Sequence, residues 1–551
     1  MQKPVRALAV FALVALASPL IAACGSSDDD GGGGTGKSGG EITIAIPSYV
    51  DHLDPSASYT VEAWQALWVT YTPLLTYKRA EGAEGNELIP GIAESLPEIS
   101  EDGKTYRLKV RKGLKYSDGT PIKASDFERV VQRIYTNQGG GESYFDPIVG
   151  APEYAEQPNP EADISGIKPN DRTGELTITL SEANSTFANI LATNFAGMVP
   201  GDTPLELLDK EPPPSYGPFK IGQVEPNRSF ELLKNADFDL PGIPPAKLDK
   251  INVTFQKSLQ RQTQDVISGE LDYMTEPVPA DLLPEVQAKY KDRYEEQPVS
   301  SSYYFFLDHT SAPFNDKKVR QAVNYAVDGR APARVYGGLL VPGCNFLPEG
   351  IVGYQKIEDC PYGDRNSDPD LDRARQMIEE AGVDGMEFKV YGNDEEPTRR
   401  ITEYWSDTLN KIGFKTEPEI VEASVYFDTI GNEKTGAKTG FHNWFPDYPH
   451  PYSYLFLLEG KTVQPVRNQN YSRVQDPVYD RKLQELLKEP DVESVADGWA
   501  ELDRRIVDEA HLVPYGQRKL STFVSERMDF ENCTLYHPNY YDDFSSFCLK
   551  E

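Results

Sequence analysis

The sequence predicts an α/β protein with more than one lobe, and three observations support this prediction. The chain has 551 residues, and chains of this length usually fold as two or three lobes rather than as one small domain. Apolar and polar side chains alternate from residue 106 to residue 110, which is the pattern of a half-buried strand. Apolar residues recur at helical spacing in the segments 319–327 and 371–381. We therefore expect both strands and helices.

The first thirty residues have the composition of a bacterial export signal. Lys3 and Arg6 precede an apolar run over residues 7–20, and Ile21-Ala22-Ala23-Cys24 resembles the lipobox at which a lipid is attached. The run is too short to span a bilayer comfortably. We expect a lipoprotein signal peptide at residues 1–23 and a lipid anchor on Cys24. The alternative is a cleaved signal that happens to carry a cysteine. The anchored protein would face the extracellular or periplasmic side of the cell membrane.

Residues 24–40 predict a flexible tether. From Gly25 onward this segment is mostly Gly, Ser and Asp and holds no apolar residue. Residues 31–38 also satisfy the phosphate-loop pattern GxxxxGK[ST], which works only between a strand and a helix. Because a strand-like segment (Ile42 to Ile46) follows it instead of a helix, we expect no nucleotide site.

Composition limits the possible partners. The formal net charge is −32 at pH 7, and nucleic-acid binding needs a basic face, so nucleic acid is not an expected partner. The negative charge keeps an exported surface soluble, and it would also favour cationic ligands. No second apolar run is long enough to cross a bilayer, so we expect anchoring through the N-terminus alone.

Four cysteines remain after Cys24, and an even number in an oxidising compartment indicates two disulfide bonds. Three pairings are possible from sequence alone. Pairing Cys344 with Cys360 and Cys533 with Cys548 would close loops of about fifteen residues, each contributing roughly 3 kcal/mol in the chain-entropy model. A zinc site is the alternative, although these spacings lack CxxC pairs.

The segment from residue 91 to residue 134 has the clearest local organisation. Asp102-Gly103 predicts a turn before the strand at 106–110, and Ser117-Asp118-Gly119 predicts a second turn after it. Ser125 and Glu128 have the spacing of a capping box, which predicts the start of a helix there. The apolar face of this helix would carry Val130, Val131 and Ile134.

Two further helices are predicted in the second half of the chain. Val319 to Val327 places apolar residues on one helical face, and Gly329 follows as a candidate C-cap. Asp368-Pro369 predicts the start of another helix, which Gly382 would end.

Several motifs, taken in order, resemble extracellular solute-binding protein family 5. The string Ala93-Glu94-Ser95-Leu96, followed by Tyr106 to Gly119, is similar to the family's signature. Further segments that match in the family's order are 216–220, 314–328, 347–350 and 444–449. Members of this family are the oligopeptide-, dipeptide- and nickel-binding subunits of ABC importers.

The resemblance implies a particular α/β fold, the two-lobed periplasmic-binding-protein type II fold in its large cluster C form. Ligand binds between the two lobes, which close over it. The first lobe would comprise residues 41–86, 216–297 and 515–551. A subdomain, residues 87–215, would be inserted in this first lobe, and the second lobe would comprise residues 298–514.

The resemblance also implies a ligand site around Asp447, with Trp444 and Tyr448 beside it. In peptide-binding members the acid of the Trp-x-x-Asp-Tyr motif pairs with the free α-amino group of the ligand, and Asp447 matches that position. A solvated loop acid beside core aromatic residues is the other reading of Asp447. Tyr49 and Tyr303 are further candidates for cleft-lining residues, since tyrosine offers rigid apolar area with a polar end.

We therefore expect an anchored, monomeric receptor that captures short peptides and delivers them to the transmembrane subunits of an ABC permease with their ATPases. Neither a cofactor, a resident metal nor a catalytic residue is expected. The alternatives are an oligosaccharide ligand, nickel bound near His442 and His450, a surface receptor that senses peptides, or an anchored hydrolase. The sequence contains no GxSxG, HExxH or Cys-His pattern for the hydrolase.

Overall fold

A five-stranded mixed sheet joins the first strand of the described chain to strands from residues 219–274. The computed structural model describes residues 36–47 and 50–551, of which 36–551 belong to one folded unit. The order in the sheet is β11-β1-β10-β9-β8. β1 pairs in parallel with β10 and β11, and the other pairs are antiparallel. The bounds are Glu41–Ile46 (β1), Phe219–Glu225 (β8), Ser229–Lys234 (β9), Lys250–Phe255 (β10) and Tyr273–Met274 (β11).

The strand predicted at residues 42–46 is confirmed as β1, and it anchors the start of the folded unit. Ahead of it, the amide of Lys37 donates to the carbonyl of Leu549, and that of Gly39 donates to the carbonyl of Lys247. These bonds attach the end of the expected tether to the fold. The signal peptide, Cys24 and the cleft candidate Tyr49 lie outside the described residues.

A four-stranded antiparallel sheet, β4-β5-β7-β6, occupies residues 98–179. Its strands are Glu98–Ile99 (β4), Thr105–Lys109 (β5), Ile167–Asn170 (β6) and Glu175–Thr179 (β7). β5 is the strand predicted from alternation, and Tyr106, Leu108 and Val110 are buried as expected. The neighbouring helices are Asp126–Asn137 (α2), Glu142–Phe145 (α3), Ala151–Glu156 (α4) and Phe187–Ile190 (α5).

Helix α2 begins where the sequence predicts, but the predicted capping box is wrong. Ser125 already has helical backbone angles, with φ −66°, and its side chain does not cap the helix. Its hydroxyl instead donates to Asp171 at 2.9 Å. Glu128 accepts a hydrogen bond from the amide of Ile164 at 2.6 Å. Both side chains thus connect α2 to loops that are distant in sequence.

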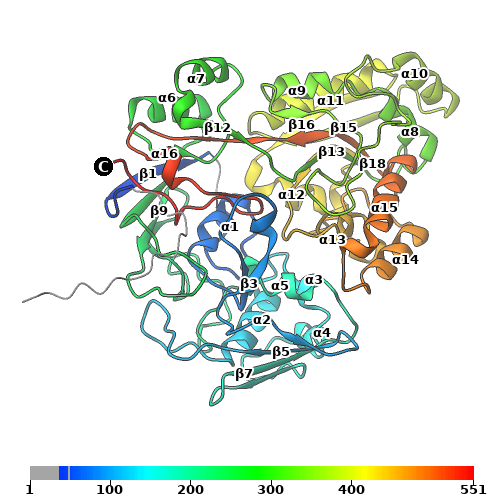
Figure 1. The fold of residues 1–551 in the computed structure, drawn as a ribbon. Coiled ribbons are helices and arrows are strands. Elements are labelled where there is room, and N and C mark those ends of the chain that lie inside the picture. The colour runs from blue at the N-terminus through cyan, green and yellow to red at the C-terminus, as the bar shows by residue number, and fades with distance from the viewer. Residues whose placement is uncertain (1–35, 48–49) are drawn as a thin grey trace, which may run out of the picture. The chain divides into compact units, whose positions relative to one another are not determined.

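A six-stranded mixed sheet, β14-β18-β13-β17-β15-β16, is built from the second half of the chain. Helices α8 to α11 lie beside it (Figure 1), and α11 packs on β15 and β16. The strands are Ser302–Leu307 (β13), Leu340–Val341 (β14), Glu387–Asn393 (β15), Lys415–Val421 (β16), Thr439–Trp444 (β17) and Leu512–Arg518 (β18). The helices are Lys317–Tyr325 (α8), Arg330–Val335 (α9), Leu371–Glu380 (α10), Thr398–Lys411 (α11), Ala423–Gly431 (α12), Tyr452–Leu455 (α13), Pro477–Leu486 (α14) and Ala496–Asp508 (α15).

The two helices predicted in this half are present as α8 and α10, but the role predicted for Gly329 is wrong. Helix α8 ends at Tyr325 with Ala326 as its C-cap, and Gly329 is the N-cap of the next helix, α9. Gly329 has φ −66°, so it does not use the left-handed conformation of a C-cap glycine. Gly382 does follow the end of α10 with φ +67°, as predicted.

Two chain crossings connect the five-stranded and six-stranded sheets. β12 (Tyr294–Gln297) pairs antiparallel with β19 (Leu520–Phe523), next to the points where the chain enters β13 and leaves β18. Because β18 extends to Arg518, the second sheet includes residues beyond the expected lobe boundary at 515. After β19 the chain returns toward β1 (Figure 1) through α16 (Phe530–Cys533) and the hairpin β20 (Tyr536–His537) and β21 (Tyr541–Asp542).

Two large hydrophobic cores correspond to this arrangement. The first core contains buried residues of the five-stranded and four-stranded sheets together with the C-terminal Phe544 and Phe547. The second core is formed within residues 303–515, around the six-stranded sheet. The segment expected as an inserted subdomain therefore shares its core with the five-stranded sheet. Val61–Trp68 (α1), Leu75–Tyr77 (β2) and Leu88–Pro90 (β3) also contribute to the first core. Leu259–Ser268 (α6) and Leu283–Lys289 (α7) pack in a third, smaller cluster with Ala45 of β1 and Phe523 of β19.

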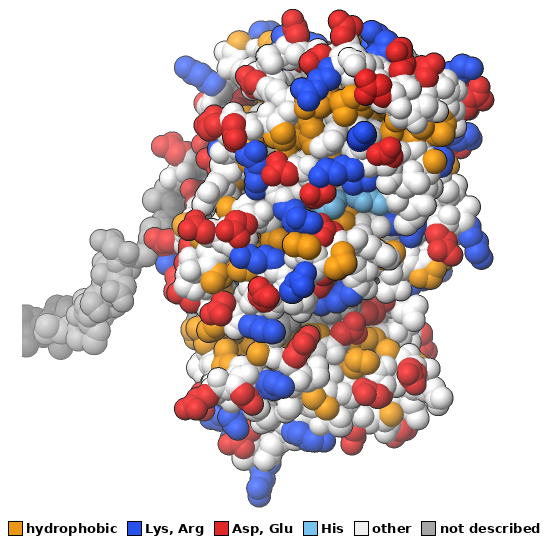
Figure 2. Space-filling view, turned by 90° about the vertical axis from the view of Figure 1, so that its right-hand side faces the viewer, with side chains coloured by type: hydrophobic (Ala, Val, Ile, Leu, Met, Phe, Trp, Pro, Cys, Tyr) orange, Lys and Arg blue, Asp and Glu red, His pale blue; other side chains and the backbone are white. Residues whose placement is uncertain are grey.

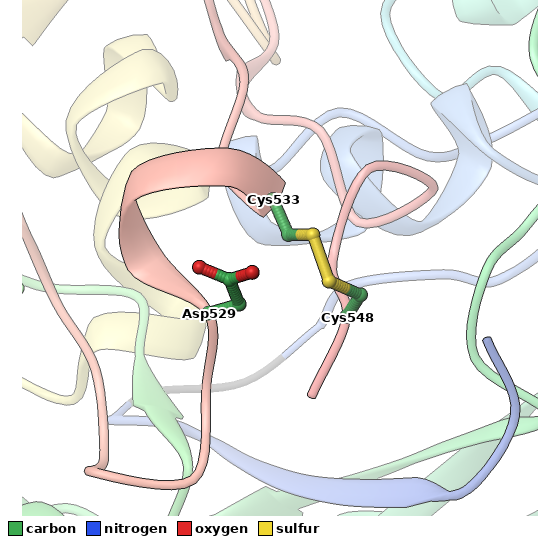
Figure 3. A group of neighbouring side chains, drawn as sticks. All are labelled: Asp529, Cys533 and Cys548. Carbon is green, nitrogen blue, oxygen red and sulfur yellow. A yellow bond between two sulfur atoms is a disulfide. The ribbon is translucent and has the colours of Figure 1, made fainter. Parts of the chain in front are cut away.

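Both disulfide bonds form with the pairing that closes the shorter loops. Cys344 is bonded to Cys360, and Cys533 is bonded to Cys548. Among the described residues, the one group of three or more metal-type donors that lie together is Asp529, Cys533 and Cys548 (Figure 3). Its two sulfur atoms form the disulfide, whereas zinc needs thiolates. Because these two sulfurs are bonded to each other, they are not available as zinc ligands.

The charge pattern of the surface and the length of the helices bear on the expectations about nucleic acid and membranes. On the face shown in Figure 2, basic side chains are interspersed with acidic ones rather than gathered in one patch. Within residues 36–47 and 50–551, no helix combines the length and the apolar character that a membrane span requires.

Candidate ligand-binding cavity

A cavity of about 870 Å³ is lined by residues from both large sheets and their connections. One side is contributed by residues near α1, by the segment 275–281 and by the hairpin β20–β21. The other side includes residues near β13, the segment 441–447, and Arg518, Leu520 and Ser521. Its volume lies within the range of about 300–1,000 Å³ typical of small-ligand pockets.

Asp447 lies in the loop that follows β17, and helix α13 holds this loop in place. The amide of Asp447 donates to the Ser453 hydroxyl at 2.8 Å. The Trp444 indole Nε1 donates to the Ser453 carbonyl at 2.7 Å. Both ends of the Trp444–Asp447 turn are thus fixed to one serine.

The carboxylate of Asp447 is buried and is bonded to two tyrosine hydroxyls. Its side chain is 6% exposed, which is inconsistent with the reading of a solvated loop acid. Tyr144 from α3 donates to its Oδ2, and Tyr59, just before α1, donates to the same oxygen at 3.4 Å. Burial raises the pKa of Asp447 to about 7, although both hydroxyl bonds act in the opposite direction.

No Lys or Arg within the described residues forms an ion pair with Asp447. The group is therefore a desolvated carboxyl that only neutral donors contact. A cation that reaches it would gain a charge-assisted hydrogen bond in a low-dielectric setting.

Trp444 and Tyr303 are among the residues that line the cavity, whereas Tyr448 is not. Trp444 packs edge-on against Tyr59, with ring centroids 6.0 Å apart. Tyr303 is 1% exposed and contacts Phe445 edge-on at 6.3 Å. Tyr448 is fully buried in the first core and packs on Tyr144 at 6.0 Å. It supports Tyr144, which bonds to the Asp447 carboxyl and is itself not among the lining residues.

The cavity contains a partly buried ion pair that the sequence analysis missed. The guanidinium of Arg518, at the end of β18, lies 3.2 Å from Glu276 and also sits over the ring of Tyr336, 5.0 Å from its centroid. Arg518 and Glu276 are separated by 242 residues, and no local motif surrounds either of them. Tyr59 and Tyr144 were missed for the same reason.

The two histidines weighed as nickel ligands lie in different surroundings. His442 lines the cavity, is 1% exposed, and burial lowers its pKa to about 3. His450 packs on Trp499 with ring centroids 5.4 Å apart and is not among the lining residues. Neither belongs to a group of three metal-type donors among the described residues. The arrangement does not favour nickel.

The cavity is lined by residues of two sheets, and crossing strands connect these sheets. This arrangement is that of a two-lobed binding protein. Solved structures with this fold match nearly the whole chain. One is clavulanic acid biosynthesis oligopeptide binding protein 2, with TM-score 0.83 and 24% identity over 94% of this chain and 99% of that one. Another is DppA from Helicobacter pylori in complex with the peptide STSA, with TM-score 0.78 and 20% identity over 94% and 99%. The predicted type II periplasmic-binding-protein fold is confirmed.

The chain belongs to the bacterial extracellular solute-binding proteins, family 5, whose model matches residues 87–465. Heme-binding protein A of Haemophilus influenzae is 27% identical over 440 residues, which cover 76% of each chain. Glutathione-binding protein GsiB of Escherichia coli strain K12 is 24% identical over 416 residues, 73% of this chain and 74% of the relative. The resemblance stated from motifs is thereby confirmed.

Proposed function

We propose that this protein captures short peptides with a free α-amino group and delivers them to an ABC permease. The observation that carries this proposal is the buried carboxyl of Asp447, which lines the cavity and accepts hydrogen bonds from two tyrosine hydroxyls, with no ion-pair partner among the described residues. An α-ammonium group of a ligand would supply the positive charge that no described Lys or Arg provides to this carboxyl. Similar folds were solved with peptides bound, namely DppA with STSA and Haemophilus influenzae OppA with RPPGFSPFR.

Closure of the lobes would make the site selective for an amine. Tyr144 belongs to α3 and Asp447 to the loop after β17, so their hydrogen bond links two segments that are 303 positions apart in sequence. When the lobes close over a ligand, water is displaced, and the attraction between ammonium and carboxylate strengthens. We expect the ammonium to bind the ionised Asp447 while the tyrosine hydroxyls remain as donors to the same carboxylate.

Peptides are favoured over the other ligands considered. A sugar would use the aromatic walls but would leave a desolvated carboxyl without a cation, which is unfavourable. Binding requires no chemical step, so we propose no catalytic residue and no cofactor. Because the family is one of solute-binding proteins, binding followed by transfer to the permease subunits and their ATPases accounts for the cavity.

We propose that the protein acts as a monomer outside the cytoplasm, held at the membrane by a lipid on Cys24 after removal of residues 1–23. This rests on the lipobox-like sequence. Cys24→Ala should move the protein from the membrane fraction to the soluble fraction after cell lysis. Persistent membrane partition of the variant would contradict the anchor.

The experiment that tests peptide capture is calorimetric titration with a free-amine tripeptide pool, its N-acetylated counterpart, and hemin as the competing ligand class. We expect saturable one-to-one binding of the free-amine peptides and a loss of at least about tenfold in affinity on acetylation. Equal binding of both pools would contradict the amine contact, and binding of hemin alone would contradict peptide capture.

A further inference from the structure

The charges that line the cavity are strongly unbalanced. Ten Asp or Glu residues but only four Lys or Arg residues contribute to the lining. Each of the four basic side chains already has a partner. Arg518 pairs with Glu276 at 3.2 Å, Arg400 with Glu396 at 3.1 Å, and Lys257 with Asp394 at 3.9 Å. Arg467 donates to a backbone carbonyl at 2.7 Å. The lining thus carries negative charge that the protein itself does not neutralise.

After Asp447, Glu62 is the clearest example of an acidic lining residue that no basic side chain neutralises. It lies in the first turn of α1, lines the cavity, and has no ion pair among the described residues. Burial raises its pKa to about 8, and the nearby carboxyls of Glu276, Glu395 and Asp51 act in the same direction. The surroundings of Asp447 are different, because burial and two tyrosines determine its pKa. Asp447 and Glu62 are therefore two separate carboxyls in one cavity, and a cation bound at either one would favour its ionised form.

A group of aromatic rings that contact one another begins next to this second point. Tyr541 lies close enough that Glu62 helps to raise its pKa. Phe445 packs edge-on against Tyr541, with ring centroids 5.8 Å apart, and edge-on against Tyr303 at 6.3 Å. Tyr536 lies 6.3 Å from Tyr541 between ring centroids. All of these residues line the cavity. Aromatic faces beside a carboxylate attract guanidinium and ammonium groups through cation–π interactions.

One polar group at this position lacks a partner. The side chain of Tyr536 is 7% exposed, and its hydroxyl has no hydrogen-bond partner among the described residues. Buried hydroxyls are normally hydrogen-bonded, so this group is available to a ligand. A divalent metal ion is not favoured, because Glu62 belongs to no group of three metal-type donors in the described part of the chain.

We propose that Glu62, together with Tyr303, Phe445, Tyr536 and Tyr541, forms a subsite that binds the cationic side chain of an Arg or Lys residue in the peptide. This inference rests on the proposed function and adds a ligand preference to it. A basic peptide would then use two anionic points at once, its α-amino group at Asp447 and its side chain at the Glu62 subsite.

The test uses alanine tetrapeptides with a free α-amino group that carry either arginine or citrulline at the second, third or fourth position. Citrulline has the shape of arginine without its charge. For the wild-type protein, we expect arginine to bind at least about tenfold more tightly than citrulline at one position. Glu62→Gln should reduce this preference to less than about threefold. Asp428→Asn, which changes an exposed carboxyl of the same cavity, should preserve the preference.

Equal affinities for arginine and citrulline at every position, or a preference that survives Glu62→Gln, would overturn the subsite. If Glu62→Gln does not fold, the pH dependence of the wild-type protein tests the subsite instead. The preference for arginine over citrulline should rise between about pH 6 and pH 9 as Glu62 ionises. A preference that is independent of pH would count against Glu62. Binding of tetra-alanine without any arginine preference refutes the subsite alone, whereas failure of all free-amine peptides refutes peptide capture.

Discussion

Replacing Asp447 with asparagine separates its role in binding from its role in the fold. The amide keeps the shape of the side chain, and its oxygen still accepts from Tyr144 and Tyr59. The bond to Ser453 uses the backbone amide of residue 447 and is unaffected. The free energy of unfolding should therefore change by less than about 1 kcal/mol. What the variant loses is the negative charge that faces the ammonium group of the ligand.

The expected loss of affinity follows from breaking a buried pair. Removing one partner of a buried ion pair costs about 3–5 kcal/mol. A loss of that size weakens binding by roughly two to four orders of magnitude. The measurement should be made near pH 8, because a carboxyl with a pKa of about 7 is mostly ionised there.

The assay is isothermal titration of wild type, Asp447→Asn and Asp428→Asn with a free-amine tripeptide and its N-acetylated form. Asp428 is an exposed carboxyl of the same cavity, so its variant controls for a general change in cavity charge. If Asp447 binds the amine, acetylation should cost little further affinity in Asp447→Asn, because both changes remove the same interaction. Affinity of Asp447→Asn within about threefold of wild type, or fully additive losses, would refute the assignment.

Three further predictions concern pH, the tyrosine contact and one disulfide. Peptide affinity should fall about tenfold per pH unit below about pH 7, because Asp447 must release a proton to pair with the ammonium. Calorimetry at a series of pH values measures this fall. An affinity that stays constant from about pH 5 to 7 would contradict the prediction. Tyr144→Phe removes a hydroxyl bond that lowers the pKa of Asp447. The fall in peptide affinity on acidification should therefore begin at a higher pH in this variant. A fall at the same pH as in the wild type would exclude an effect of the Tyr144 hydroxyl on Asp447. The double variant Cys533→Ser, Cys548→Ser opens a loop with a sequence separation of 15 and should lose about 3 kcal/mol of stability in urea unfolding; a loss below about 0.5 kcal/mol would show that this bond constrains little.

The sequence predicted those parts of the fold whose signals are local. The alternation at 106–110 and the helix from Leu371 to Glu380 depend on neighbouring residues, and both are present. The disulfide partners were also within reach, because each pair closes a short loop. The capping box at Ser125 failed because tertiary contacts engage both side chains. Gly329 failed because a second helix, α9, begins at the position where the first was expected to be capped.

The candidate site was predicted only in part, for a physical reason. Asp447 and Trp444 were found through a motif, but the side chain of Tyr448, the next residue after Asp447, lies in the core. In an irregular loop no periodicity indicates which side chains face the cavity. Tyr144 reaches Asp447 across 303 positions of sequence, and its own neighbours carry no sign of that contact. Such partners are determined by the packing of separate lobes.

The most direct test of peptide capture is native mass spectrometry of the protein lacking residues 1–24, isolated from its host, with identification of whatever dissociates from it. We predict short peptides with free α-amino groups, at one per protein molecule, with arginine or lysine over-represented relative to a pool of host peptides. Recovery of glycans, a metal ion or hemin in place of peptides would contradict the proposed function.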